Sequence, residues 1–397
     1  MHTLRPATLD DVDFLLDVAI EATRAQGRLS AAADEPGWRE GFDDLTREQL
    51  AADPTGTSVI ELAGRPIGRL RVARHPASIE LCGIQLDPTV QNQGIGTAII
   101  RELQQEAADR GVPLDLGVER DNTNARRLYE RLGFRQFAAD DREDKLRWRR
   151  DIWTADVASK YDTPGVGMWS PDLLGPTTAR LAELAGTGRA LEFAIGTGRV
   201  AVPLAERGVP VSGIELSPPM VEQLRTKADE ATIPVTIGDM SAVRVPGEFS
   251  LVYLVFNTIS NLLTQEDQVA CFRNAARHLT PGGHFVIELW VPELRRLPPG
   301  TPATVGIADP DYILLDTYDV LNQHVTSYHF RFTPDTTEAH LDRSPHRYIW
   351  PAELDLMAQL AGFTLASRHA NWQGAAFTAD SPSHISTYRL DAVPENE

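Results

Sequence analysis

The sequence has only two cysteines in 397 residues, Cys82 and Cys271. Two cysteines are too few for a disulfide framework or a cluster of thiolate ligands, so we expect no metal site. No run of apolar residues approaches the ~20 that cross a bilayer. The polar opening, MHTLRPATLDDVD, also lacks the apolar core of a signal peptide. These absences predict a cytoplasmic protein with no membrane partner.

Basic charge is scarce as well. The formal net charge is −18, and the 38 lysines and arginines form no stripe along the chain. A nucleic-acid backbone is bound through such a stripe, so we expect no nucleic-acid partner. With 42% apolar residues over 397 positions, the chain is long enough for two globular domains.

Two glycine-rich loops are present, QNQGIGTA at residues 91–98 and LEFAIGTGR at residues 191–199. Each follows an apolar, β-like run and precedes a helix-like run. Glycines let the backbone approach a ligand closely, and a helix N-terminus presents unpaired N–H groups and the positive end of a dipole. Two such loops in one chain predict two cofactor-binding domains joined head to tail.

The pattern of elements also changes along the chain. Residues 1–150 mix strands with helices, residues 151–160 form the predicted linker, and residues 161–397 alternate strand and helix. Alternation of this kind favours a doubly wound parallel sheet. Residues 312–320 and 324–332 interrupt it and predict a late antiparallel β insertion. In the first half, helices are expected over 38–52, 95–110 and 124–131, and strands over 57–62, 67–73, 78–86 and 114–118.

Residues 1–150 resemble the GNAT superfamily of acyl-CoA N-acyltransferases. The first matching block is Gln91, Gly94 and Gly96, in the order Gln-x-x-Gly-x-Gly. The second block starts at Asn122 and runs through Tyr129 to Leu-Gly-Phe at 132–134. Two blocks in the family's order make the resemblance specific, and it implies a mixed-sheet α/β domain that uses acetyl-CoA.

The resemblance also implies site residues. Backbone groups of Ile84 and Leu86 would pair with the pantetheine arm, and Tyr129 would give a proton to the departing thiolate. An amine attacks a thioester only when it is neutral, so Glu80 or Glu119 is a candidate base. The alternatives are an exposed strand carboxylate for either glutamate and a packed tyrosine for Tyr129. The remaining coenzyme A contacts would come from Gln91, Gln93, Gly94, Ile95, Gly96, Thr97 and Asn122.

Residues 161–397 resemble class I S-adenosylmethionine-dependent methyltransferases, whose first motif reads acidic-x-Gly-x-Gly-x-Gly. Here the motif begins at Glu192, continues through Gly196 and Gly198, and has Ala194 in place of the first glycine. Glu215, 17 residues after Gly198, would hold the ribose hydroxyls.

Further methyl-donor contacts follow from the same resemblance. Asp239 and Met240 would meet the adenine, Phe256 would lie at the mouth of the pocket, and Tyr161 would belong to a lid. A rival reading, an NAD(P)-dependent dehydrogenase, needs Gly-x-Gly-x-x-Gly, but position 201 is alanine.

The favoured function is a bifunctional enzyme with small-molecule substrates. It would transfer acetyl groups from acetyl-CoA to an amine and methyl groups from S-adenosylmethionine to a nitrogen or oxygen. One alternative makes the front domain an acetyl-CoA sensor or a scaffold, and another is modification of protein N-termini or lysines. The sequence leaves both acceptors and a homo-oligomer open. Candidates for the methyl-acceptor pocket are His324, His329, His346, Tyr348 and Trp350, within or near the stretch 344–350.

Overall fold

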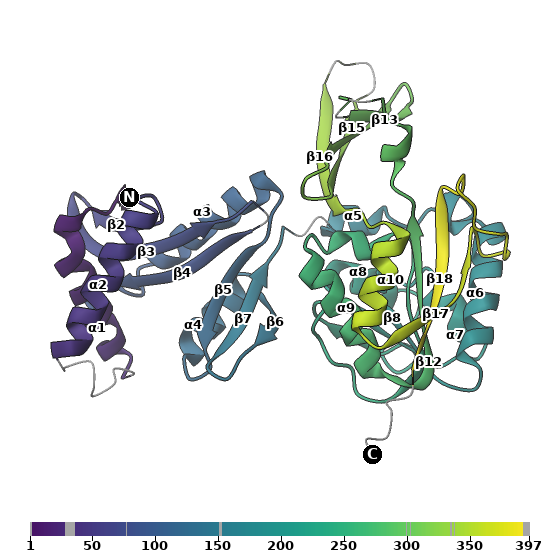
Figure 1. The fold of residues 1–397 in the computed structure, drawn as a ribbon, viewed down its shortest axis with the longest axis horizontal. Coiled ribbons are helices and arrows are strands. Elements are labelled where there is room, and N and C mark those ends of the chain that lie inside the picture. Colours follow the sequence, from purple (N-terminus) through teal and green to yellow (C-terminus); the bar gives the residue numbers. More distant parts are fainter. Residues whose placement is uncertain are drawn as a thin grey trace. The chain divides into compact units, whose positions relative to one another are not determined.

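A computed structural model describes residues 2–27, 36–76, 78–150, 153–298, 300–301, 303–333, 336 and 338–391. The chain divides into two compact units, Met1–Arg150 and Asp151–Glu397, and each is described by itself (Figure 1).

The described residues of the first unit form a seven-stranded mixed sheet with helices on both faces. In sheet order the strands are β1 (His2–Pro6), β2 (Thr57–Leu62), β3 (Arg65–Arg74), β4 (Ile79–Leu86), β5 (Leu114–Glu119), β7 (Glu143–Trp148) and β6 (Arg135–Ala139). The helices are α1 (Val12–Ala25), α2 (Pro36–Ala52), α3 (Ile95–Arg110) and α4 (Thr123–Arg131).

The core of the first unit follows from alternation along its strands. Leu70 and Val72 of β3 are buried and pack with Ile99 and Leu103 of α3. Residues between them on β3 therefore point to the opposite face, because side chains of a strand alternate. That opposite face carries a second, smaller core around Leu15 of α1.

The described part of the second unit forms a seven-stranded sheet that is parallel except at β18. Its strands, in sheet order, are β10 (Val235–Ile237), β9 (Val211–Glu215), β8 (Ala190–Phe193), β11 (Phe249–Leu254), β12 (Leu279–Trp290), β18 (Ser383–Leu390) and β17 (Phe363–His369). The strand order reverses direction between β8 and β11, as in doubly wound folds. This confirms the predicted fold class.

Helices cover both faces of this second sheet. Residues of α6 (Pro171–Ala185), α7 (Ala201–Glu206) and α8 (Pro218–Arg225) pack into one hydrophobic cluster. Residues of α9 (Gln265–His278) and α10 (Pro351–Leu360) pack into another, on the opposite face. A short helix, α5 (Ala155–Ser159), precedes them.

The predicted late insertion is antiparallel, but it forms a sheet of its own rather than joining the main one. The described strands β13 (Ala303–Ala308), β14 (Tyr312–Asp319), β15 (His324–Phe332) and β16 (Ala339–Arg347) make up this four-stranded sheet. It lies between β12 and α10 in the chain and extends away from the main sheet (Figure 1). Buried Arg347 anchors its end, donating to Gln268 Oε1 at 2.6 Å and to Glu353 Oε1 at 2.6 Å.

Within the described ranges, no helix combines the length and the apolarity that crossing a bilayer requires.

We predict that Gly198→Ala destabilises the second unit through a clash. A Cβ at Gly198 would lie 2.3 Å from Leu224 Cδ1 and 3.1 Å from Val202 Cγ2. Gly282 has the same φ of +81°, yet a Cβ there would meet nothing within 4 Å. Urea unfolding should show Gly198→Ala losing about 1–3 kcal/mol more than Gly282→Ala. Equal losses would mean that Leu224 moves aside without cost.

Candidate active sites

Backbone strain gathers at the point where the second sheet reverses its strand order. Six described non-glycine residues have a positive φ, and three of them follow the adjacent strands β8 and β11. These are Ala194 at 51°, Phe256 at 56° and Asn257 at 63°. Such conformations cost about 1–3 kcal/mol each and gather at functional sites. The carboxyl ends of strands at a reversal are also where doubly wound folds bind ligands.

Glu215, the last residue of β9, holds the glycine-rich loop in place. Its Oε2 accepts a hydrogen bond from the Gly196 amide at 2.8 Å, and its Oε1 accepts one from the Ser217 amide at 2.9 Å. The side chain is buried, with 5% of the residue exposed. A carboxylate oxygen can accept more than one hydrogen bond. Glu215 can therefore fix the loop and still accept hydrogen bonds from a ligand.

Glu192 is buried on β8, the strand that pairs with β9. The Tyr253 hydroxyl, on the neighbouring β11, donates to its Oε2 at 2.8 Å. Burial raises the pKa of Glu192 to about 8, so the carboxyl is protonated at neutral pH. A cationic group brought next to it would favour the ionised form. Tyr253 was not among the residues predicted from sequence, because it lies 61 positions away along the chain.

Asp239 and Met240 follow β10 and differ in what they offer. Asp239 is buried, and its Oδ1 accepts hydrogen bonds from the Ser241 amide at 2.8 Å and the Ser241 hydroxyl at 2.6 Å. Its Oδ2 has no recorded partner among the described residues. The Met240 side chain is buried in the core, and its carbonyl accepts a hydrogen bond from Asn274. A fixed carboxylate with one open oxygen suits a ligand amine.

The segment before α6 is fastened to the glycine-rich loop. The Thr197 hydroxyl donates to Asp162 Oδ1 at 2.6 Å, and Lys227 Nζ donates to Asp162 Oδ2 at 2.5 Å. Arg199 Nη1 donates to the Met168 carbonyl at 3.0 Å. Sequence reasoning singled out Tyr161 but missed its neighbour Asp162, which makes the contacts.

Two aromatic residues complete this region. Tyr161 is half-buried, its ring meets Trp153 edge-on at 5.3 Å, and burial raises the pKa of its hydroxyl. Phe256 is 43% exposed, its amide donates to Glu288 Oε2 at 2.8 Å, and the Arg199 guanidinium lies 5.3 Å from its ring centre. An exposed ring on strained backbone is available to a ligand.

Two of the five candidates for the methyl-acceptor pocket already contact other groups of the chain. His324 Nε2 lies 2.8 Å from the Leu263 carbonyl, and His329 Nδ1 lies 2.6 Å from the Tyr312 hydroxyl. Burial lowers the pKa of His346 to about 4, so this ring is neutral. Tyr348 is buried and Trp350 is 36% exposed.

In the first unit, the glycine-rich loop turns into α3 as the sequence predicts. Gly94 has a φ of +82° and occupies the N-cap position of the helix that starts at Ile95. The Gln91 side chain donates to the Leu86 carbonyl at 2.9 Å, so it shapes the loop from within. The Gln93 side chain donates to the Thr89 carbonyl at 3.3 Å. The backbone amides of the first residues of α3, including that of Thr97, lie at the start of this helix.

The strands next to this loop separate. β4 and β5 pair only from Ile79 to Leu81 and from Leu114 to Leu116, although β4 continues to Leu86. The register with β3 shifts at this point, where Leu81 pairs with Val72 and Gly83 pairs with Arg71. Backbone groups of the later part of β4, around Ile84, are thus left without β5. An extended ligand can pair with such an edge as an added strand.

The predicted catalytic residues of the first unit occupy different environments. Tyr129 is buried, its ring meets Phe134 edge-on at 5.6 Å, and desolvation raises its pKa to about 12. Glu80 is exposed, with Oε2 3.9 Å from His75 Nε2. Glu119 is the exposed last residue of β5. The Asn122 side chain accepts a hydrogen bond from the Ala125 amide at 3.2 Å and caps α4.

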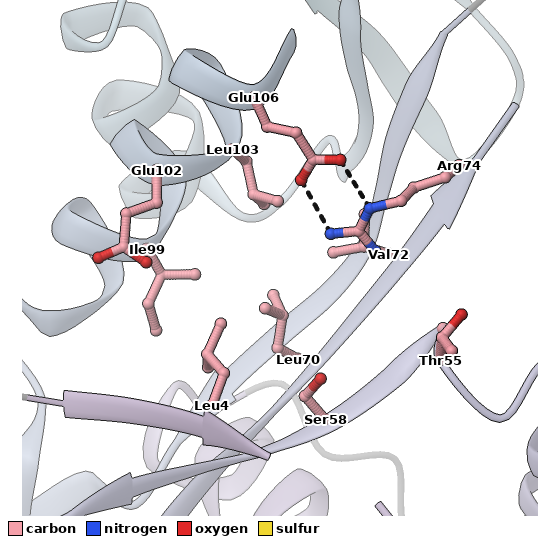
Figure 2. A pocket seen from close by; sticks show the side chains of 11 residues that line it. Leu4, Thr55, Ser58, Leu70, Val72, Arg74, Ile99, Glu102, Leu103 and Glu106 are labelled. Atoms are coloured by element: carbon pink, nitrogen blue, oxygen red, sulfur yellow. Dashed lines mark hydrogen bonds and ion pairs between the residues drawn. The ribbon is translucent and has the colours of Figure 1, made fainter. Parts of the chain in front are cut away.

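A pocket of about 270 Å³ lies between β1–β3 and α3 (Figure 2). Two residues that line the pocket form an ion pair: Arg74 donates two hydrogen bonds, of 2.7 and 2.9 Å, to the carboxylate of Glu106. None of the residues predicted from sequence lines it. The candidate coenzyme A site is therefore defined by the loop and the separated strands rather than by this pocket.

We predict that Glu192 makes the second unit less stable as pH rises. Its pKa of about 8 exceeds the 4.5 of a free glutamate, so the folded state holds a proton that the unfolded state releases. The resulting stability is complete below pH 4.5 and is lost as pH rises toward 8, by up to about 1.4 kcal/mol per pH unit. Urea unfolding at pH 6 and 7.5 should show this slope in the wild type and a flatter one in Glu192→Gln. Identical slopes would place an ionised Glu192 in the folded protein.

Comparison with known proteins assigns a family to each unit. The model of the acetyltransferase (GNAT) family matches residues 24–134, and that of a methyltransferase domain matches residues 190–283. The cypemycin N-terminal methyltransferase of a Streptomyces species is 26% identical over 194 residues, covering 48% of this chain and 78% of that protein.

The mycothiol acetyltransferase of Thermomonospora curvata is 36% identical over 122 residues, which are 30% of this chain but only 40% of that protein. Among solved structures, the CcbJ methyltransferase from Streptomyces caelestis is 34% identical with a TM-score of 0.53, covering 60% of this chain and 96% of that one. The chain is a fusion of a GNAT-family acetyltransferase domain with a methyltransferase domain.

Proposed function

We propose that this chain is a bifunctional enzyme acting on small molecules. Its first unit would transfer an acetyl group from acetyl-CoA to an amine, and its second would transfer a methyl group from S-adenosylmethionine to a nitrogen or oxygen. The observation that carries the methyl-transfer half is the set of strained residues beside Glu215, where β8 and β11 end. The separation of β4 from β5 beside the start of α3 supports the acetyl-transfer half.

The groups around the second loop suit S-adenosylmethionine. Glu215 would accept hydrogen bonds from the ribose hydroxyls, and Asp239 Oδ2 would accept one from the adenine amine. Glu192 would ionise beside the amino-acid moiety of the donor. The bound donor supplies an activated methyl group, so the chain's main task is to align the acceptor and exclude water. The segment before α6, which is held through Asp162, would exclude water.

The first unit offers both proton transfers that amide formation requires. The Tyr129 hydroxyl, whose pKa burial raises to about 12, is protonated at neutral pH and would donate to the departing thiolate. An exposed carboxylate, Glu80 or Glu119, can take the proton of the attacking amine directly or through water. Backbone of β4 near Ile84 and Leu86 would hold the pantetheine arm.

A nitrogen acceptor is favoured for methyl transfer. The cypemycin relative is named an N-terminal methyltransferase, and its match covers 48% of this chain at 26% identity. An amine needs no strong base once it is neutral. This fits the low pKa of His346 and the engaged ring nitrogens of His324 and His329.

We predict that Glu215→Ala weakens binding of S-adenosylmethionine by tenfold or more. Hydrogen bonds to a charged group contribute about 1.5–3 kcal/mol, and the substitution also frees the Gly196 amide. Calorimetric titration of the full chain measures the change, with acetyl-CoA affinity as the internal control. Unchanged affinity for S-adenosylmethionine would remove the site assignment.

We predict that Gly96→Val abolishes acetyl-CoA binding while leaving S-adenosylmethionine affinity intact. A Cβ at Gly96 would contact only Leu86 and Ile84, at 3.8 and 3.9 Å, so the fold tolerates it. The larger side chain would instead occupy space that the cofactor needs. Gly41→Val in α2 is the matched control, because a Cβ there meets nothing within 4 Å. Loss of both affinities would mean that the two sites are not independent.

A further inference from the structure

Two arginines of β3 point away from α3. Leu70 and Val72 pack with α3, so Arg69 and Arg71, which alternate with them, lie on the opposite face of the sheet. Across the pair with β4, Arg69 faces Gln85 and Arg71 faces Gly83. These four positions form one patch on that face, which we call the β3–β4 patch.

Among the residues that the structure describes, the two arginines of the β3–β4 patch have no anionic partner. Neither Arg69 nor Arg71 makes a recorded hydrogen bond or ion pair with a described residue, and the buried Nε of Arg69 is unsatisfied. Burial and the nearby charge of Arg71 lower the pKa of Arg69 to about 10. Other arginines of this unit do pair with carboxylates, namely Arg5, Arg74, Arg126 and Arg147. What marks the β3–β4 patch is that two such arginines lie side by side on one face and that the Nε of one of them, Arg69, is buried.

Gln85 adds a second unsatisfied group. Its Oε1 is buried without a hydrogen-bond partner among the described residues. A Cβ at Gly83 would lie 3.5 Å from Gln85 Nε2, so the amide lies over a position with no side chain. Phe42 of α2 lies next to Arg69, with its ring centre 5.3 Å from the guanidinium carbon. Buried polar groups left unpaired destabilise a fold, and a bound ligand that pairs with them removes that cost.

The β3–β4 patch lies beside the place where acetyl transfer would occur. Ile84 and Leu86, on either side of Gln85, face the start of α3 and would meet the coenzyme A arm. Because α3 packs on that face, the acetyl acceptor would approach from the other one, part of which α1 and α2 cover. Gln85 and its neighbour Arg69 lie on this second face.

We propose that Arg69 and Arg71 bind a carboxylate or phosphate group of the acetyl acceptor, so that the first unit acetylates amines that also carry a negative charge. The proposal rests on the acetyltransferase function proposed above. A guanidinium presents a planar fork of donors that matches either anion. Gln85 would hydrogen-bond another polar atom of the same molecule. Arg69 is then a specificity-determining residue that positions the acceptor without taking part in the proton transfers.

Direct binding tests the anion site without activity. In the full chain with coenzyme A bound, the Arg69 Nε–Hε resonance is assigned by its loss in Arg69→Met. Sodium acetate or inorganic phosphate should shift this resonance in a saturable way, whereas acetamide should not. The two anions distinguish a carboxylate site from a phosphate site. No shift with either anion would overturn the proposal.

Turnover tests the substrate class. Matched pairs are 4-aminobutyrate with butylamine, and phosphoethanolamine with ethanolamine. We expect a kcat/KM at least tenfold higher for the anionic member of one pair. Most of this difference should come from a lower KM. Arg69→Met should lose the preference, and Arg65→Met, at the exposed start of the same strand, should keep it. Equal preference in Arg69→Met and the wild type would overturn the proposal.

Two controls distinguish acceptor binding by Arg69 from a structural role and from a role in cofactor binding. Methionine in place of an unpaired buried cation should leave the unfolding temperature unchanged or raise it. A lower unfolding temperature with the preference retained would make Arg69 structural and overturn the proposal. If Arg69→Met also loses acetyl-CoA affinity to the same extent as it loses the preference, the arginine binds the cofactor, and the proposal is overturned. If acetyl-CoA binds but no amine is acetylated, the acetyltransferase function fails, and the resonance experiment alone decides the anion site.

Discussion

The carboxylate of Glu215 is the constraint on which the second unit's site depends. It receives the amides of Gly196 and Ser217, so the loop after β8 and the turn after β9 share one anchor. The Gly196 amide that it binds belongs to a turn in which Ala194 and Gly196 both have left-handed backbone. Thr197 and Arg199, placed by the same loop, then fix the segment around Asp162 and Met168.

The first unit organises its glycine-rich loop differently. No carboxylate holds it among the described residues; a glutamine side chain, Gln91, bridges back to the end of β4. The loop therefore presents helix amides beside strands that have already separated. One unit fixes its loop with negative charge, whereas the other leaves positive potential exposed. The unpaired arginines on the opposite face of β3 extend this difference.

The sequence predicted those helices and strands whose ends are set by residues close together in the chain. The bounds of α3 followed from the glycine turn before Ile95 and the helical spacing after it. Helix α6 was missed because Gly175 and Pro176 lie inside it, and tertiary packing overrides their low helix propensity. The bond from Tyr253 to Glu192 joins residues 61 positions apart, and the missing partner of Arg69 depends on what other strands bring near. No local pattern encodes either.

The position of β18 has a consequence for how the second unit is made. This strand lies between β12 and β17 and pairs with both, although it is the last of the three to be synthesised. Until residues 383–390 emerge, β12 and β17 expose unpaired edges that can join other chains. The first unit has the same arrangement, with β7 between β5 and β6, but β7 ends at Trp148, so this unit can fold while the second is still being synthesised. Slow translation through the second unit would prolong the aggregation-prone interval.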